Sequence, residues 1–473
     1  MVTTNNNADS GQTGQAIAPV PTSATLLLTP LRAGVPAEGG AMEVLVRVQA
    51  PQRPPQADGA AHKRMPLRLA LVVDRSGSMS GEPLDEALRC VQHIGSLLQP
   101  EDQLAVVLYD DHVQVPMPLA RAPGAQAVQQ ALDGVDSGGS TDLHAGWETG
   151  ARELVAGSAG AISRVVLLSD GQANHGLTDT VAIASECTQW LQRGVSTTTV
   201  GLGRGFNEEL MVAMAQAGGG QQYYGQRAED LYDAFDEELS LLQAMMLRQL
   251  RVKPVLAPEV LAEPLGLATA DAAGWMSLPD LAWGAEAWIL LRLHVAAEAG
   301  GITPRAAEQG ADQPVQRTLL GLSLQAQDMD GATVAMHVAP LMLPVLPAAK
   351  VARLPADETV ARRLQEVGFA DMTMQVRQLL QQGKTGEARA LLRRAEEQVA
   401  NYPWLAGKLQ RLQALLERDA MMASKEMLFS SRKMGRRLSA SVESYAVADE
   451  TESTEIPAYL RRKGEEGTGR KRT

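Results

Sequence analysis

Five residues with small oxygen-bearing side chains follow three predicted strands, and their chemistry points to a metal site. Asp74, Ser76 and Ser78 come directly after the apolar run LRLALVV, Thr141 lies in SGGSTDL, and Asp170 ends VVLLSD. Hydroxyl and carboxylate oxygens are the ligands that hard divalent cations prefer, so we predict Mg²⁺ here, with Mn²⁺ or Ca²⁺ as alternatives. Because two of the five side chains at most are charged carboxylates, the ion could accept one more anionic oxygen.

The elements that must position these residues alternate between strand and helix over residues 67–247. Short apolar runs, LRLALVV, DQLAVVLY, ISRVVLLS and GVSTTTV, are each followed by a stretch of helical period. Leu84, Leu88 and Val91, for example, fall on one helix face. This order predicts a doubly wound, mostly parallel sheet with helices on both faces, whose ligand site lies beyond the carboxyl ends of the strands.

The flanking segments predict a different architecture. Residues 24–50 alternate weakly between apolar and polar, and residues 248–350 return to strand-like runs without helical period. We expect the two segments to form one β-sandwich that the α/β domain interrupts, followed by a helical C-terminal domain. The predicted order is a disordered tail (1–22), strands and linker (23–64), the α/β domain (65–247), the sandwich (248–352), the helical domain (353–446) and a charged disordered tail (447–473).

The three motif parts DRSGS, GGSTDL and LLSDG resemble the metal-ion-dependent adhesion site of von Willebrand factor A domains. The resemblance covers about residues 67–247. It implies that Asp74, Ser76 and Ser78 ligate the metal directly or through water, that Thr141 and Asp170 complete the shell, and that an Asp or Glu of a partner takes the open position. The whole arrangement also resembles bacterial cytosolic proteins of the calcium-activated-chloride-channel-like group, a label that implies no channel here.

Other readings of the sequence are weaker. A degenerate site that keeps only the fold is the alternative to metal binding. Enzymatic motifs fail: Phe206 stands where a dinucleotide fingerprint needs its third glycine, and Gln378 stands where a P-loop needs its first. His144 and His175 lie in or near the site loops without a catalytic Ser/His/Asp order, so no catalytic residue is predicted and we expect the protein not to be an enzyme.

Charge restricts the class of partner. The chain carries a net charge of −12, and residues 67–247 hold 24 acidic side chains against nine arginines and no lysine. This excess disfavours nucleic acid. It favours a protein partner that presents its Asp or Glu within a basic surrounding. Near the end, the basic segment from Lys425 to Arg437 predicts either a solvated helix face or docking on an acidic surface, and Arg436 and Arg437 resemble a site for a Ser/Thr kinase acting at Ser439.

The cysteine content and the apolar segments of the sequence predict the cellular compartment, and the motifs predict the role. With only Cys90 and Cys187, no disulfide framework is possible, and no secretory signal is readable, so we expect a cytoplasmic protein. The uncharged stretch 331–349 contains three prolines and is not predicted to span a membrane. The predicted function is a metal-dependent adaptor in a multiprotein assembly. The alternatives are a subunit or cofactor of an AAA+ ATPase, chaperone or kinase-regulated assembly, and a metal-dependent enzyme acting at the same loops.

Overall fold

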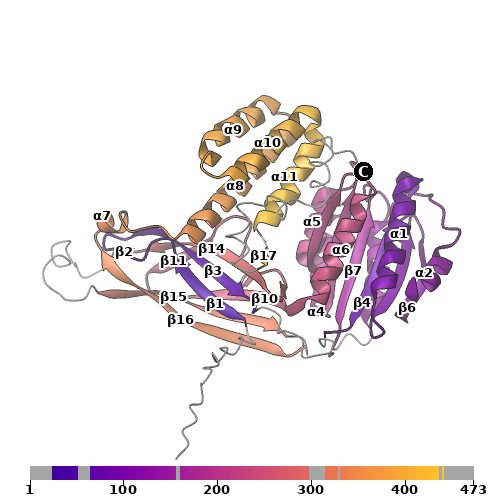
Figure 1. Cartoon of the computed structure of the whole chain (residues 1–473), viewed down its shortest axis with the longest axis horizontal. Coiled ribbons are helices and arrows are strands. Elements are labelled where there is room, and N and C mark those ends of the chain that lie inside the picture. The colour runs from indigo at the N-terminus through magenta and orange to yellow at the C-terminus, as the bar shows by residue number, and fades with distance from the viewer. Residues whose placement is uncertain are drawn as a thin grey trace, which may run out of the picture.

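The computed structural model has three parts, and it describes residues 24–51, 64–155, 160–297, 315–328, 331–435 and 439–440. Figure 1 shows an α/β domain at one end, a β-sandwich at the other, and a helical domain that leans over the junction between them. From residue 433 onward only the backbone is described. The predicted tails, residues 1–22 and 447–473, lie outside the described residues.

The α/β domain is built on a six-stranded sheet with the strand order β6-β5-β4-β7-β8-β9. All neighbouring strands are parallel except β6, which runs antiparallel to β5. The strands are β4 (Leu67–Asp74), β5 (Gln103–Tyr109), β6 (Val113–Arg121), β7 (Ile162–Ser169), β8 (Val195–Leu202) and β9 (Gly219–Gly225). The helices are η1 (Gly77–Met79), α1 (Glu82–Leu97), α2 (Gly124–Leu132), α3 (Leu143–Val155), α4 (Thr180–Gln192), α5 (Glu208–Ala217) and α6 (Asp230–Gln243).

Helices cover both faces of this sheet, which is why its central strands are apolar without alternation. Every residue of β4 is buried. Leu71 belongs to a core cluster shared with α1, α2 and α6. Its neighbour Val72 belongs to a second cluster shared with α3, α4 and α5. Successive side chains of a strand point to opposite faces, so the two clusters lie on opposite sides of the sheet.

The β-sandwich combines strands from before and after the α/β domain, as predicted. One sheet contains β1 (Thr25–Pro30), β3 (Gly40–Gln49), β14 (Ala285–Val295) and β11 (Val260–Pro264) in that order. The other contains β12 (Met276–Ser277), β10 (Met245–Leu256), β15 (Gln316–Gln327), β16 (Thr333–Leu346) and β2 (Val35–Pro36), with β13 (Leu281–Ala282) beside β10. Because β3 pairs with β14 over ten residues, the α/β domain is an insertion between two strands of one sheet system.

The helical domain contains α7 (Ala348–Val351), α8 (Glu358–Gln381), α9 (Thr385–Val399), α10 (Pro403–Arg418) and α11 (Ala420–Gly435). Val360 and Val367 of α8 pack on Leu45 and Trp288, on the face of the first sheet that turns away from the sandwich core. One detail differs from the sequence interpretation. Residues 439–440 are not helical but form β17 (Ser439–Ala440), which pairs with β14, because the edge of β14 offers free backbone partners there.

No helix among the described residues combines the length and apolar character needed to cross a bilayer. The uncharged stretch 331–349 is mostly β16, which pairs with β15 along the second sheet. Its side chains alternate between exposed and half-buried over much of the strand, as expected for a strand with one face toward solvent.

A buried ionic cluster joins the α/β domain to the sandwich. Arg164 on β7 is 1% exposed, and its Nη1 donates to Thr198 Oγ1 at 3.0 Å. The same guanidinium lies 3.4 Å from Glu238 Oε1 and 3.3 Å from Oδ2 of Asp280, which belongs to the sandwich segment. Asp280 Oδ1 also accepts the backbone N–H of Gln249 at 2.8 Å. Each charge in this cluster therefore has a partner on another element.

Replacing this arginine by an apolar side chain should be severely destabilising. Arg164→Met leaves two buried carboxylates without their shared cation, so we expect the free energy of unfolding to fall by about 3–5 kcal/mol. Chemical denaturation measures this loss. The control is Arg152→Met, whose exposed pair with Glu148 on α3 should contribute less than about 1 kcal/mol. Equal stabilities of the two variants would contradict a structural role for the cluster.

Candidate metal centre

Asp74 is the last residue of β4 and is fully buried. Its Oδ1 accepts the backbone N–H of Ser76 at 2.8 Å, which turns the chain sharply out of the strand. Its Oδ2 accepts the hydroxyl of Ser169, at the end of β7, at 2.8 Å. The carboxylate is therefore held from two neighbouring strand ends, and it forms the floor of the site.

The two serines of the loop reach from this floor toward Asp170. Ser76 Oγ lies 3.2 Å from Ser78 Oγ, and Ser78 Oγ donates to Asp170 Oδ1 at 2.7 Å. Ser76 is buried, whereas Ser78 is exposed, so the chain of oxygens runs from the interior to the surface. Hydrogen bonds of this kind place a hydroxyl and a carboxylate oxygen where both could turn to one cation.

Thr141 faces the same gap from the loop before α3. Its backbone N–H donates to Asn174 Oδ1 at 2.8 Å, and its carbonyl accepts the N–H groups of Asn174 and His175 at 3.2 Å. A Cβ placed on Gly171 would lie 3.3 Å from Ser78 Oγ and 3.5 Å from Thr141 Oγ1. The two hydroxyls thus border a space that even a methyl group at position 171 would fill.

The five predicted residues therefore lie at one edge of the sheet, and their donor set fits a hard divalent cation. Two carboxylates and three hydroxyls converge from the ends of β4 and β7 and from the loop between α2 and α3, and the glycine leaves a cradle between them. Thr141 therefore follows a helix and not a third strand, in contrast to the sequence prediction. Metal binding itself remains a prediction.

Burial changes the acidity of both carboxylates. Burial of Asp74 raises its pKa to about 6, with Asp170 adding a smaller repulsion and the bonds from Ser76 and Ser169 opposing the rise. Burial also raises the pKa of Asp170, against the hydrogen bond from Ser78. Because a folded-state pKa above the usual value favours the protonated form, the carboxyl stabilises the fold below that pKa, and this contribution is lost as pH rises through about 6.

We therefore expect Mg²⁺ to stabilise the protein more near neutral pH than in acid. Well above pH 6 the buried Asp74 is charged and a cation offsets the cost, whereas in acid the proton competes with the metal. The measurement is the rise in melting temperature on adding MgCl₂, once near neutral pH and once in acid well below pH 6. Asp74→Asn is the control and should abolish the rise at both pH values, because it removes a predicted ligand. An equal rise at both pH values in the wild type would contradict the assignment.

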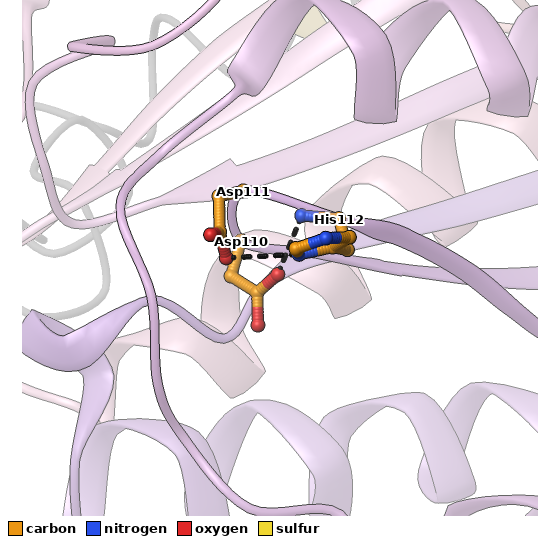
Figure 2. Close-up of side chains that lie close together, drawn as sticks. All are labelled: Asp110, Asp111 and His112. Carbon is orange, nitrogen blue, oxygen red and sulfur yellow. Dashed lines mark hydrogen bonds and ion pairs between the residues drawn. The ribbon is translucent and has the colours of Figure 1, made fainter.

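An acidic turn beside the site was not singled out by the sequence interpretation. Figure 2 shows Asp110, Asp111 and His112 at the end of β5, with the ring and backbone of His112 turned toward the two carboxylates. Asp110 Oδ1 accepts the backbone N–H of His112 at 2.7 Å, and Asp110 Oδ2 lies 2.7 Å from Nη2 of Arg75. The carbonyl of Asp110 also accepts the N–H of Asp142, the residue after Thr141.

This turn is a support for the candidate centre. Asp110 is buried and ties the Asp74 loop, through Arg75, to the Thr141 loop. Asp111 and His112 are exposed. One carboxylate oxygen each of Asp110 and Asp111 and one ring nitrogen of His112 lie close enough together to hold an ion. Exposed acidic groups, however, commonly lie close together without one. The signal available in the sequence was the acidic pair directly after an apolar run.

The imidazole rings of both site histidines contact carboxylates outside the predicted ligand set. His144 Nε2 lies 2.8 Å from Glu186 Oε2, on the neighbouring helix α4. His175 Nδ1 lies 3.3 Å from Oδ2 of Asp142, whose Oδ1 accepts the N–H of Ala145 at the start of α3. Both rings are thus engaged by carboxylates that belong to the surrounding scaffold.

The loop after β8 closes the site on the side of Asp170. A Cβ at Gly205 would lie 2.6 Å from the carbonyl oxygen of Asp170, so only glycine permits this approach. Gln172 Nε2 donates to Gly205 O at 2.6 Å. The glycine-rich segment GLGRGF is therefore a tight turn that packs against the metal-site loop, not a nucleotide cradle.

Helix α11 docks on the α/β domain next to this loop. Lys425 is 2% exposed, and its Nζ donates to the carbonyl of Phe206 at 2.7 Å and to Glu208 Oε2 at 2.6 Å. Leu428 and Phe429 join the core cluster of the α/β domain. Among the described side chains of the basic segment, the buried Lys425 and the apolar packing of Leu428 and Phe429 hold it against the α/β domain. Arg436 and Arg437 lie outside the described residues, and phosphorylation at Ser439 remains a prediction.

Comparison with known proteins identifies the α/β domain. Residues 69–237 match the family model of the von Willebrand factor type A domain. This part of the chain is a von Willebrand factor type A domain, as the sequence motifs predicted. The family model covers the strands and loops that carry all five predicted ligands, but it does not extend into the sandwich or the helical domain.

Two relatives are themselves uncharacterized. A protein of Synechocystis sp. is 26% identical over 252 residues, which is 49% of this chain and 58% of that protein. The protein YfbK of Escherichia coli is 32% identical over 162 residues, which is 33% of this chain and 28% of that protein. The chain therefore spans less than two thirds of the length of either relative.

Solved structures share the fold over most of the chain. A von Willebrand factor type A protein from Catenulispora acidiphila superposes with a TM-score of 0.64 at 13% identity, covering 89% of this chain and 98% of that one. The ArnB paralog VWA2 from Sulfolobus acidocaldarius gives a TM-score of 0.57 at 16% identity, covering 87% and 99%. At this coverage the likeness includes the sandwich and the helical domain.

Proposed function

We propose that this protein is a metal-dependent protein-binding module, with a divalent cation at the candidate metal centre that accepts a carboxylate from a partner. The observation that carries the proposal is the convergence of Ser76, Ser78 and Asp170 through the hydrogen bonds of Ser78. The buried Asp74 holds the backbone of Ser76, and Thr141 faces the same gap. Mg²⁺ is the ion we expect, and Mn²⁺ or Ca²⁺ could replace it.

The chain's own residues explain why an outside carboxylate would be needed. When bound, the cation supplies a positive centre that attracts anionic oxygen. The hydroxyls of Ser76, Ser78 and Thr141 are neutral, so they hold an ion without cancelling its charge. Asp74 is buried beneath it and cannot reach solvent, which leaves the exposed side of the site, beside Ser78, for a partner.

The surroundings favour a protein partner with a basic rim. The α/β domain has 24 acidic side chains against nine arginines, which repels an acidic group unless positive charge accompanies it. An adaptor role in a multiprotein assembly fits this mode of binding, with an AAA+ ATPase or chaperone as one class of partner. A reducing compartment such as the cytoplasm is supported by Cys90 and Cys187, which are both buried and free.

Selection from phage-displayed random peptides tests the proposal. The immobilised full chain binds peptides in MgCl₂, and bound phage are released with EDTA. We expect the released peptides to be enriched in Asp or Glu, and replacing that acid by its amide should abolish binding. The matched control is Thr141→Val, which should release few peptides. EDTA-released peptides without acids, or equal recovery from Thr141→Val, would contradict the proposed function.

The same preparations test the absence of catalysis. We propose that the module binds without turnover, so the metal-loaded protein should hydrolyse neither phosphoesters nor nucleotides above the background of Thr141→Val. Turnover that depends on Thr141 would favour the alternative of a metal-dependent enzyme at these loops.

A further inference from the structure

A pocket of about 380 Å³ opens beside the candidate metal centre. It begins at Ser78 and Asp170, two of the predicted ligands, and extends between the loops that follow β8 and β9. Its size lies within the ~300–1,000 Å³ range of small-ligand sites. We call it the site pocket, and its lining residues are Ser78, Glu82, Pro83, Asp170, Leu202, Gly203, Arg204, Gly205, Gln226, Arg227, Ala228 and Glu229.

Two of the nine arginines of the α/β domain line this pocket together with the predicted ligands Ser78 and Asp170. The side chain of Arg204 is 71% exposed, and its Nη2 lies 2.7 Å from Asp419 Oδ2 at the start of α11. Arg227 is 48% exposed, with Nε 3.6 Å from Glu229 Oε2. A guanidinium has five donors, so a single contact of Arg204 with Asp419 does not use up its capacity for a second carboxylate.

Once a cation is bound, the pocket therefore has a second source of positive charge beside the metal, on a domain that is otherwise strongly acidic. A partner's carboxylate would be repelled over most of this surface but attracted at these two places. Glu82 and Glu229 also line the pocket and would repel additional negative charge. A ligand with two carboxylates is therefore favoured over one with a longer run of acids.

We propose that the ligand is a partner segment with two carboxylates, one on the metal and one on Arg204 and Arg227. This inference rests on the proposed function and adds its specificity. A pocket of this volume has dimensions on the order of 7 Å, so two carboxylates bound in it must lie within about two extended residues of each other. Side chains two residues apart lie on the same face of an extended chain, so the segment has the pattern acid-x-acid.

The phage selection, repeated on arginine variants, tests the second contact. On the wild type, EDTA-released peptides should be enriched for a second acid two residues from the first. The most enriched peptide is then synthesised, together with the form in which the second acid is its amide. We expect the two-acid peptide to bind about fivefold tighter in MgCl₂, the upper range for exposed charge pairs. Arg204→Gln combined with Arg227→Gln should remove this difference.

A matched control separates ligand binding from domain docking. Arg204→Gln also breaks the pair with Asp419, but Asp419→Asn breaks the same pair and leaves the guanidinium in place. Asp419 Oδ1 accepts the N–H groups of Met421 and Met422, and asparagine caps helices equally well, so α11 should stay formed. Asp419→Asn should therefore keep the preference for two acids.

The outcomes distinguish the two proposals. If EDTA-released peptides carry a single acid and bind the arginine variants as tightly as the wild type, the second contact is wrong and the metal-dependent function stands. If no acidic peptide is released by EDTA, the proposed function is contradicted and this inference falls with it. Loss of the two-acid preference in Asp419→Asn would assign the effect to docking of α11 and would also overturn the inference.

Discussion

Removing residues 1–50 is expected to unfold the β-sandwich while the von Willebrand factor A domain stays folded. The deletion takes away β1 and β3, and β3 lies between β1 and β14 in the first sheet. Val44, Leu45, Val46 and Val48 on β3 are all fully buried. At about 1.5–3 kcal/mol for each buried side chain, their loss removes about 6–12 kcal/mol, which is comparable to the entire stability of a domain.

Hydrogen exchange resolves this prediction element by element. Amides of β14 and β15 should lose their protection in the truncated chain, whereas those of β4 and β7 should keep it. The von Willebrand factor A domain has its own core on both faces of its sheet, which is the reason to expect independent folding. Deleting residues 1–23 alone is the matched control and should change neither region. Full protection of β14 after the longer deletion would show that the sandwich does not need its first strands.

The fold was predictable where the local pattern and the tertiary role agree. The apolar run that becomes β4 is buried on both faces, and its continuous hydrophobicity predicts this burial. The sandwich was predictable because the strands after the α/β domain were too few to stand alone. The pairing of Ser439 with Glu286 on β14 was not, because a two-residue strand has no periodicity to detect.

The candidate site was likewise predictable only in part. Asp74, Thr141 and Asp170 each follow a recognisable strand or precede a helix, so their meeting point followed from the topology of a parallel sheet. The contact of Arg75 with Asp110 joins two strand ends through side chains, and no sequence spacing records it. Lys425 lies in a basic run typical of a solvated face, and its burial is explained by two partners on another domain, the carboxylate of Glu208 and the carbonyl of Phe206.

Thr141→Val is expected to weaken Mg²⁺ binding at least tenfold while the metal-free fold is retained. Valine keeps the shape of threonine and replaces the hydroxyl that faces the gap beside Gly171 with a methyl group, which cannot bind a cation. The loop is fixed by the backbone of Thr141, through Asn174 and His175, and these bonds are unchanged by the substitution. A tenfold loss corresponds to about 1.4 kcal/mol, which is modest for the removal of one metal ligand among five.

Calorimetric titration with MgCl₂ and MnCl₂ measures this effect. The wild type should bind weakly, because most ligands are neutral and one position is open, and Asp74→Ala should abolish binding altogether. Ser140→Ala is the matched control, since it removes a hydroxyl from the adjacent residue, which is not a predicted ligand. Equal metal uptake by wild type, Thr141→Val and Ser140→Ala would mean that the threonine hydroxyl holds no ion. The domain would then keep the shape of an adhesion site without its metal, and a partner would have to be recognised through the loops and the site pocket alone.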